Sequence, residues 1–165
     1  MVITDYPDTE LIENIRYNVT NCGIAESTQA RIAVEGYLWG SDAASVLSHL
    51  SGDTKFDVII LSDTVQSASI TTDKEVFNHS EHHALVKSLV LNLKRDVDAR
   101  AYVFYTHHRP WLKGKDLEFF DHACKAGFTT EHLLTERVTP MFQADRGDEV
   151  ERGTVYGQQV KWLHV

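Results

Sequence analysis

Two acidic residues follow directly after apolar, strand-like runs. In an α/β protein, ligands bind at such strand ends. Asp5 follows residues 2–4, and Asp63 follows residues 56–61 and Ser62. Ligands of a doubly wound sheet bind at the carboxyl ends of its strands, and an acid there accepts hydrogen bonds from the ribose hydroxyls of a nucleoside cofactor. Asp5 is therefore a candidate ribose ligand, and Asp63 a candidate for the point where cofactor and substrate meet. As an alternative, each carboxylate caps a turn or a helix.

An aromatic side chain between two glycines is a third candidate. The segment Gly36-Tyr37-Leu38-Trp39-Gly40 comes just after an expected strand. Its glycines would allow a ligand to approach the backbone closely, and the indole of Trp39 could pack on an adenine. A tryptophan buried in the core is an equally good interpretation.

Five of the nine histidines form two dense groups. The groups are His79, His82 and His83, and His107 and His108. His79 and His83 have the i, i+4 spacing that can chelate zinc from one helical face. Because the chain has no HExxH motif or comparable ligand frame, we predict no metal site. A metal-dependent hydrolase is the least favoured function.

The elements that must position these residues alternate between strand-like and helix-like segments. Such alternation is typical of an α/β fold. The expected strands span residues 2–4, 32–37, 56–61, 100–105, 130–138 and 154–163, and the expected helices span residues 8–22, 41–50, 78–93 and 116–126.

Residues 56–61, FDVIIL, form a nearly continuous apolar run and are expected to be buried on both faces of the sheet. No long helix separates the last two strands, so they should form an antiparallel pair. The predicted fold is therefore α/β and Rossmann-like, a mostly parallel sheet with helices on both faces and a C-terminal antiparallel pair.

Capping residues in the sequence mark the ends of two of the helices. Asp8 is the expected N-cap of the first helix. In the helix 116–126, we expect Leu117, Phe120 and Cys124 on one side and Gly127 as the C-cap.

Residues 64–75, TVQSASITTDKE, do not match a compact domain. They are polar and interrupt a strand-to-helix connection that usually takes about 2–6 residues. We expect a mobile insertion there, within a single domain that spans residues 1–165.

Seven stretches of the chain together resemble a known family. They look like the seven-strand S-adenosylmethionine-dependent lysine methyltransferases, and most closely the fungal branch once called nicotinamide N-methyltransferase, which methylates the N-terminus and a lysine of translation elongation factor 1A. FNHSEHH and HHRPW are specific to that branch. The stretches are TDYPDTELIENIRYN, GYLWG, FDVIILSD, FNHSEHH, HHRPWLKGKDLEFF, PMFQADRGDE and VYGQQVKWL.

The resemblance implies S-adenosylmethionine as cofactor and gives roles to individual residues. It implies that Asp5 with Tyr6 binds the ribose, that Trp39 packs near the adenine, and that Ser62 contacts the cofactor. Asp63 would open the family's Asp-x-x-aromatic motif as a catalytic residue, with Phe77 as the aromatic beyond the insertion. The residues implied at the substrate entrance are Asn78, His79, His107, His108, Arg109 and Trp111.

The family's first strand and its Gly-rich loop have no counterpart in the chain. Residues 2–5 already match the second strand, so we expect an N-terminally truncated sheet with a gap beside that strand. In the family the first strand lies between the second and the fourth. Two alternatives to a protein N-methyltransferase stay open: a catalytically inactive partner-binding domain that lacks the cofactor loop, and a small-molecule, nicotinamide-type N-methyltransferase.

Composition limits the partners. The net charge of −8 argues against a nucleic-acid partner, because phosphate binding needs lysine and arginine. No apolar run approaches the roughly 20 residues that cross a bilayer, and no signal peptide is visible, so we expect a cytoplasmic protein. The expected partner is elongation factor 1A as protein substrate.

Overall fold

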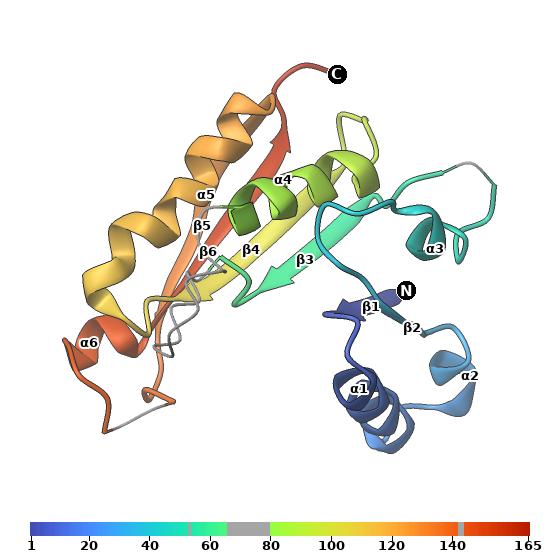
Figure 1. Ribbon diagram of the computed structural model, residues 1–165, viewed down its shortest axis with the longest axis horizontal. Coiled ribbons are helices and arrows are strands. Elements are labelled where there is room, and N and C mark those ends of the chain that lie inside the picture. The colour runs from blue at the N-terminus through green and yellow to red at the C-terminus, as the bar shows by residue number, and fades with distance from the viewer. Residues whose placement is uncertain (53, 66–79, 142–143) are drawn as a thin grey trace.

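The computed structural model describes residues 1–52, 54–65, 80–141 and 144–165 (Figure 1). The expected features that fall on Phe77, Asn78, His79 and most of the insertion lie outside these residues. The elements, in chain order, are β1 (Val2–Asp5), α1 (Thr9–Asn21), α2 (Glu26–Gln29), β2 (Ala33–Gly36), α3 (Ala44–Leu47), β3 (Val58–Ser62), α4 (Ser80–Asn92), β4 (Arg100–Thr106), the 3-10 helix η1 (Pro110–Leu112), α5 (Lys113–Lys125), β5 (Phe128–Arg137), α6 (Glu149–Arg152) and β6 (Thr154–Trp162).

The strands form two sheets. β1 and β2 pair in parallel, and a second sheet has the order β3-β4-β6-β5. In that sheet β3 and β4 are parallel, whereas β6 runs antiparallel to both β4 and β5. The predicted α/β class and the C-terminal antiparallel pair are thus confirmed.

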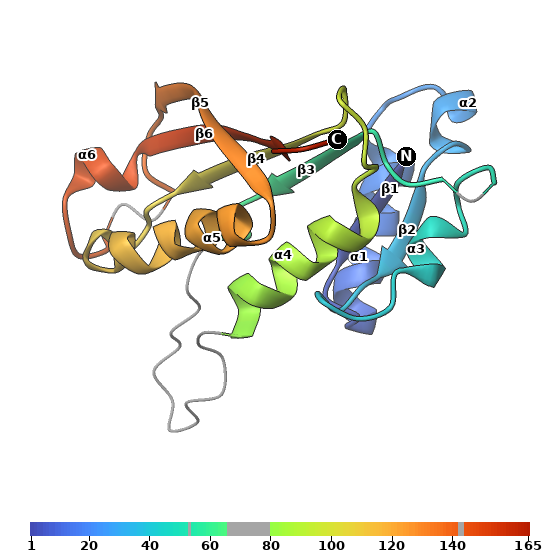
Figure 2. The ribbon, with the colours of Figure 1, turned by 90° about the horizontal axis from the view of Figure 1, so that it is seen from above.

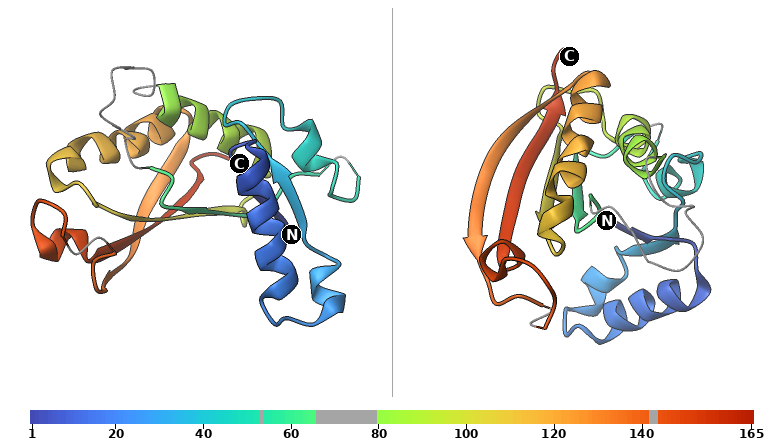
Figure 3. Two further views of the ribbon diagram at one scale, coloured as in Figure 1. Left: turned by 60° about the horizontal axis from the view of Figure 1, so that its bottom comes forward. Right: turned by 60° about the vertical axis from the view of Figure 1, so that its left-hand side comes forward.

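The expected gap separates the two sheets. Within the described part of the chain, β1 pairs only with β2, and β3 pairs only with β4. The two-stranded sheet, with α1 and α2 beside it, lies on the opposite side of the molecule from β5 and β6 (Figure 3). Two strand edges therefore lack a described partner strand.

Helices α4 and α5 lie together along one face of the four-stranded sheet (Figure 2). The main core forms between these helices and the sheet. α4 contributes Leu85 and Leu89, Leu93 follows directly after α4, and α5 contributes Phe119, all at most 1% exposed. No helix among the described residues is long and apolar enough to span a membrane.

The apolar run 56–61 predicts burial on both faces, and this prediction is wrong. Ile59 and Leu61 pack against the core, but Val58 is 53% exposed and Ile60 66% exposed. The core lies on only one side of β3, between the strand and helices α4 and α5. The strand therefore alternates between inward and outward side chains, as a sheet with one covered face does.

Of the three α5 side chains that the sequence places on one side, only Phe120 packs against the core. Leu117 is 37% exposed and Cys124 is an exposed free thiol, whereas Asp116, Phe119 and Ala123 are buried. These three follow the i, i+3, i+7 spacing of one helical face. Asp116 can lie on the buried face because its carboxylate has a partner inside the protein. The pattern of apolar residues in a sequence does not reveal such a pair.

Local signals did locate the helix ends. Asp8 caps α1, and its Oδ1 accepts hydrogen bonds from the backbone N–H groups of Glu10 and Leu11 at 3.0 and 3.1 Å. Gly127 follows α5 with φ of 94°, a conformation that glycine adopts without steric cost.

Val65, which the sequence places in the polar insertion, is instead completely buried in the core.

Candidate functional site

Asp63 follows β3 directly, as the sequence predicts, and has an unusual backbone. Its φ is 50°, and it is the one non-glycine residue with positive φ in the described ranges. Its N–H donates to the carbonyl of Phe104 at 2.8 Å, and its Oδ1 accepts from the N–H of Thr106 at 3.3 Å. Bonds to β4 from both backbone and side chain therefore hold the carboxylate at the carboxyl end of β3. Ser62, the last residue of β3, is exposed beside it.

Asp5 ends β1 with an exposed side chain. Its Oδ1 accepts a hydrogen bond from the N–H of Tyr6 at 2.7 Å, and its carbonyl accepts one from the N–H of Tyr37 at 2.8 Å. The first bond fixes the carboxylate, and the second joins the end of β1 to the segment that carries Trp39. The Tyr6 side chain is 55% exposed.

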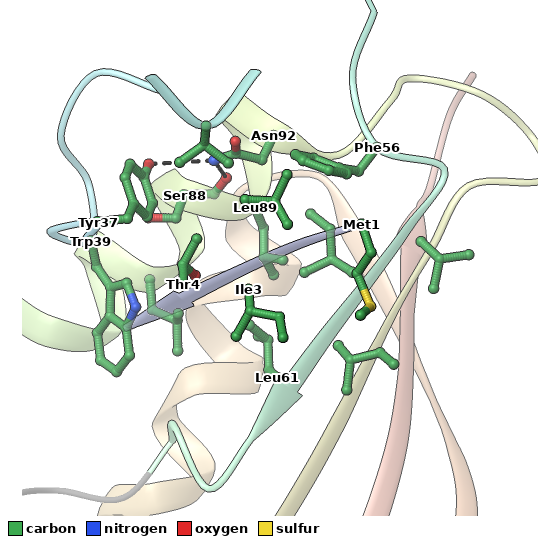
Figure 4. A pocket seen from close by; sticks show the side chains of 16 residues that line it. Met1, Ile3, Thr4, Tyr37, Trp39, Phe56, Leu61, Ser88, Leu89 and Asn92 are labelled. Carbon is green, nitrogen blue, oxygen red and sulfur yellow. Dashed lines mark hydrogen bonds between the residues drawn. The ribbon is translucent and has the colours of Figure 1, made fainter. Parts of the chain in front are cut away.

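A cavity of about 490 Å³ lies between β1 and β3 and against α4 (Figure 4). Residues 1–4 and 58–61 form two of its walls, and neither β2 nor β4 contributes strand residues to it. The cavity therefore follows the two strand edges that lack a described partner. Its volume is typical of a small-ligand pocket. The lining residues are Met1, Val2, Ile3, Thr4, Tyr37, Trp39, Val46, Phe56, Val58, Ile59, Ile60, Leu61, Leu85, Ser88, Leu89 and Asn92.

A small polar network lines this otherwise apolar cavity. Asn92 Nδ2 donates to the hydroxyl of Tyr37 at 3.3 Å and to the carbonyl of Ser88 at 2.9 Å, and Ser88 Oγ accepts from the N–H of Gly40 at 2.8 Å. Asn92 Oδ1 is buried and has no hydrogen-bond partner in the described structure. Because an unsatisfied buried acceptor is costly, a bound donor group would stabilise this wall.

Trp39 lies in the cavity wall near the carboxyl end of β1 (Figure 4). Asp5, the last residue of β1, follows the lining residue Thr4 but does not itself line the cavity, so its carboxylate lies just beyond the end of the cavity that holds Trp39. These two groups suit the ribose and the adenine of a nucleoside. No glycine loop of the described chain lies in the cavity wall beside β1, so the fit covers the adenosine part of S-adenosylmethionine only.

His107 is predicted at the substrate entrance, and its position disagrees with that prediction. The side chain is 1% exposed, and Nδ1 donates to Asp116 Oδ2 at 2.7 Å in a buried pair between the end of β4 and α5. The sequence gives no signal for Asp116 as its partner, because the two residues meet only through tertiary packing.

The rest of the predicted entrance loop is more accessible. His108 and Arg109 are half-buried, and Trp111 is 60% exposed. Gly147 lies against this loop: a Cβ there would come within 3.0 Å of Pro110 and 3.3 Å of Trp111. The structure therefore brings the acidic loop around Gly147 to the segment His107–Trp111.

The structure also contains a second hydrogen-bond network, which the sequence did not predict. Glu151 accepts from Lys113 Nζ at 2.6 Å and from the Tyr156 hydroxyl at 2.7 Å. The hydrogen bond from Lys113 is the main cause that lowers the pKa of Glu151. Burial raises the pKa of Tyr105, whose ring stacks on Tyr156 at 5.5 Å. Only the fold brings these residues of α5, α6, β4 and β6 together.

Comparison with known proteins gives close relatives. A Schizosaccharomyces pombe protein named "Protein N-terminal and lysine N-methyltransferase efm7" is 41% identical over 97% of this chain and 58% of its own length. An Eremothecium gossypii protein named "Protein N-terminal and lysine N-methyltransferase EFM7" is 43% identical over 94% of this chain and 56% of its own length. No family model matches the chain. A solved precorrin-6y C5,15-methyltransferase from Geobacter metallireducens is 12% identical with a TM-score of 0.45, over 96% of this chain and 64% of that one.

These relatives confirm the resemblance to the fungal N-terminal and lysine N-methyltransferases across nearly the whole chain. The chain spans less than two thirds of the length of either relative, 58% and 56% respectively.

Proposed function

We propose that this protein is an S-adenosylmethionine-dependent N-methyltransferase, or part of one, and that its substrate is an amine of another protein. The names of its relatives support the reaction class and a protein substrate. In line with the resemblance, the proposed substrate is the N-terminus or a lysine of translation elongation factor 1A in the cytoplasm.

The observation that carries the proposal is the backbone of Asp63. A positive φ is uncommon for a residue other than glycine, and such conformations persist where the surrounding structure fixes them, often at functional sites. Asp63 has this conformation at 50° and is held by two bonds to β4. It occupies the strand end at which the resemblance places the catalytic acid.

The reaction depends more on the positions of the amine and the methyl group than on proton transfer by the protein. When bound, S-adenosylmethionine supplies a methyl group that is activated by its sulfonium. The protein must hold the amine in line with that methyl group and exclude water around it. The Asp63 carboxylate, fixed by the Thr106 N–H, can accept a hydrogen bond from the amine and direct its lone pair.

For the cofactor, Asp5 would accept hydrogen bonds from the ribose hydroxyls. Tyr6 N–H already binds one of its carboxylate oxygens, which fixes the orientation of the group. Trp39 would cover the adenine from the cavity wall. Asn92 Oδ1, a buried acceptor without a hydrogen-bond partner among the described residues, lies in the wall of the same cavity.

A protein substrate agrees with the surface beside His108 and Arg109. Trp111 is 60% exposed, and the loop that packs on it carries Asp145 and Asp148. An exposed aromatic next to acids suits a basic, lysine-containing segment, because the ring adds cation–π attraction to the charge complementarity. The net charge of −8 favours the same kind of partner.

The second candidate is a partner-binding domain without catalysis. The gap between β1 and β3 favours it, because no described backbone segment lies there that could approach the methionine part of the cofactor. In that case the surface at Trp111 would keep its partner while the cofactor site stays incomplete.

Calorimetric titration with S-adenosylhomocysteine separates the two candidates. We expect a longer chain, extended to the length of the relatives, to bind one molecule, with the affinity reduced at least about tenfold by Asp5→Asn and by Trp39→Ala, each a loss of about 1.4 kcal/mol. Tyr17→Ala, at a side chain of α1 that is 67% exposed, is the control and should bind normally. Absence of binding to the longer chain overturns the methyltransferase proposal.

Asp63→Asn tests the catalytic assignment in the longer chain. It should keep affinity for S-adenosylhomocysteine, while methyl transfer to purified elongation factor 1A falls about 10²-fold or more. A variant that methylates at the wild-type rate contradicts the role of Asp63. A wild-type enzyme that binds the cofactor product but leaves elongation factor 1A unmethylated contradicts the substrate alone.

A further inference from the structure

Three metal-ligating side chains meet between α4 and α5, away from the cavity. His82 comes from the first turn of α4, and Glu118 and His122 lie one turn apart on α5. One ligand atom from each residue lies within 4.8 Å of the other two. We call these three residues the α4–α5 cluster, and we propose that it is a zinc site that ties the two helices together.

The first support is the hydrogen bond of His82. Its Nε2 lies 2.9 Å from the carbonyl oxygen of Val65. A carbonyl only accepts, so Nε2 must carry the proton, and in the neutral ring the lone pair is then on Nδ1. Histidines that bind metals almost always donate their other ring N–H to a carbonyl or carboxylate in this way. His82 is 9% exposed, so the ring is already held in one orientation.

The second support is an unsatisfied nitrogen on His122. Its Nδ1 is buried and has no hydrogen-bond partner in the described parts of the chain. Buried polar atoms are nearly always paired, so an unpaired nitrogen needs a physical explanation, and a bound ion is one of the few available.

The spacing of Glu118 and His122 is the third support. Residues four apart on a helix face the same side, so their side chains can reach one ion together. Two imidazole nitrogens and a carboxylate oxygen match zinc, with a fourth position for water. His83 lies beside the cluster, since its ring centroid is 3.9 Å from that of His122.

The cluster is slightly wider than a filled site. Ligand atoms around tetrahedral zinc lie about 3.4 Å apart, given metal–ligand bonds of about 2.0–2.1 Å. The spread of up to 4.8 Å closes to that value by small side-chain rotations, since Glu118 and His122 are only half-buried. The helices themselves already pack against each other.

Zinc titration of the untagged, chelator-treated protein by calorimetry tests the site. We expect saturable binding of one zinc ion per chain, a higher midpoint of thermal unfolding with zinc than with EDTA, and, with cobalt in place of zinc, the visible absorption of a tetrahedral ion. His122→Ala and the nearly isosteric Glu118→Gln should each weaken zinc binding at least tenfold.

His49→Ala is the matched control. His49 also pairs with a glutamate, Glu35, at 2.7 Å, but its partner is on β2, outside the α4–α5 cluster. This variant should bind zinc as the wild-type protein does. The proposal is overturned if the wild-type protein binds no stoichiometric zinc, or if Glu118→Gln and His49→Ala have equal effects. Because binding is measured directly, the result does not depend on methyltransferase activity.

Discussion

Replacing Asp116 by alanine tests how the loop after β4 is held to α5. The Asp116 and His107 side chains are 5% and 1% exposed, and Nδ1 of the imidazole donates to Oδ2 at 2.7 Å. Removing the carboxylate leaves the imidazole buried without this partner. Breaking a buried pair from one side costs about 3–5 kcal/mol.

We therefore expect the free energy of unfolding of Asp116→Ala to fall by at least about 3 kcal/mol. In a chain of this size, each kcal/mol lowers the unfolding midpoint by about 2–4 °C, so the expected decrease is about 6–20 °C. Urea unfolding, followed by circular dichroism, measures the free energy directly. Asp121→Ala, at an exposed acid of the same helix, should stay within about 0.5 kcal/mol of the wild type.

A double-mutant cycle tests the cause. Replacing both partners, with Asp116→Leu and His107→Phe, should be less destabilising than the sum of the two single changes, because neither polar group is then left buried alone. Additive effects, or an Asp116→Ala protein as stable as the Asp121→Ala control, would show that the pair does not hold the loop.

Three further substitutions test other parts of the structure. Leu89→Ala removes a core side chain that is 1% exposed and should cost about 2–5 kcal/mol in urea unfolding. Gly153→Ala places a Cβ 2.5 Å from the backbone oxygen of Val138, so this variant should unfold at a clearly lower temperature in calorimetry. Glu151→Gln should destabilise by about 0.5–1 kcal/mol at pH 7, since Lys113 is 43% exposed. Because the pKa of Glu151 is lowered from 4.5, its contribution is present above that pH and is lost as the pH falls through the native pKa, so the difference from wild type should disappear in acid urea titrations.

The sequence predicted features that short-range chemistry determines. The α1 cap at Asp8, the αL residue Gly127 after α5 and the last two strands each depend on a few neighbouring residues. The family resemblance added the order of the strands, and with it the gap beside β1. The sequence pattern itself indicated the acid after β3, because the end of an apolar run marks the end of a strand.

Other features depend on which faces the tertiary structure covers. Val58 and Ile60 look like core residues, yet only one face of β3 packs against the main core. His107 follows a strand, as a site residue would, but its side chain is buried in a pair with Asp116. The partner of each such residue lies on another element, so neither periodicity nor spacing could reveal it.

The described residues on either side of the segment 66–79 are held to the core. Before it, Asp63 is bonded to β4, and Val65 is completely buried. After it, His82 donates to the Val65 carbonyl, a contact between residues 17 positions apart. The contact between His82 and Val65 therefore joins the start of α4 to the segment that follows Asp63. Zinc at the α4–α5 cluster would hold His82 in place and so strengthen this contact.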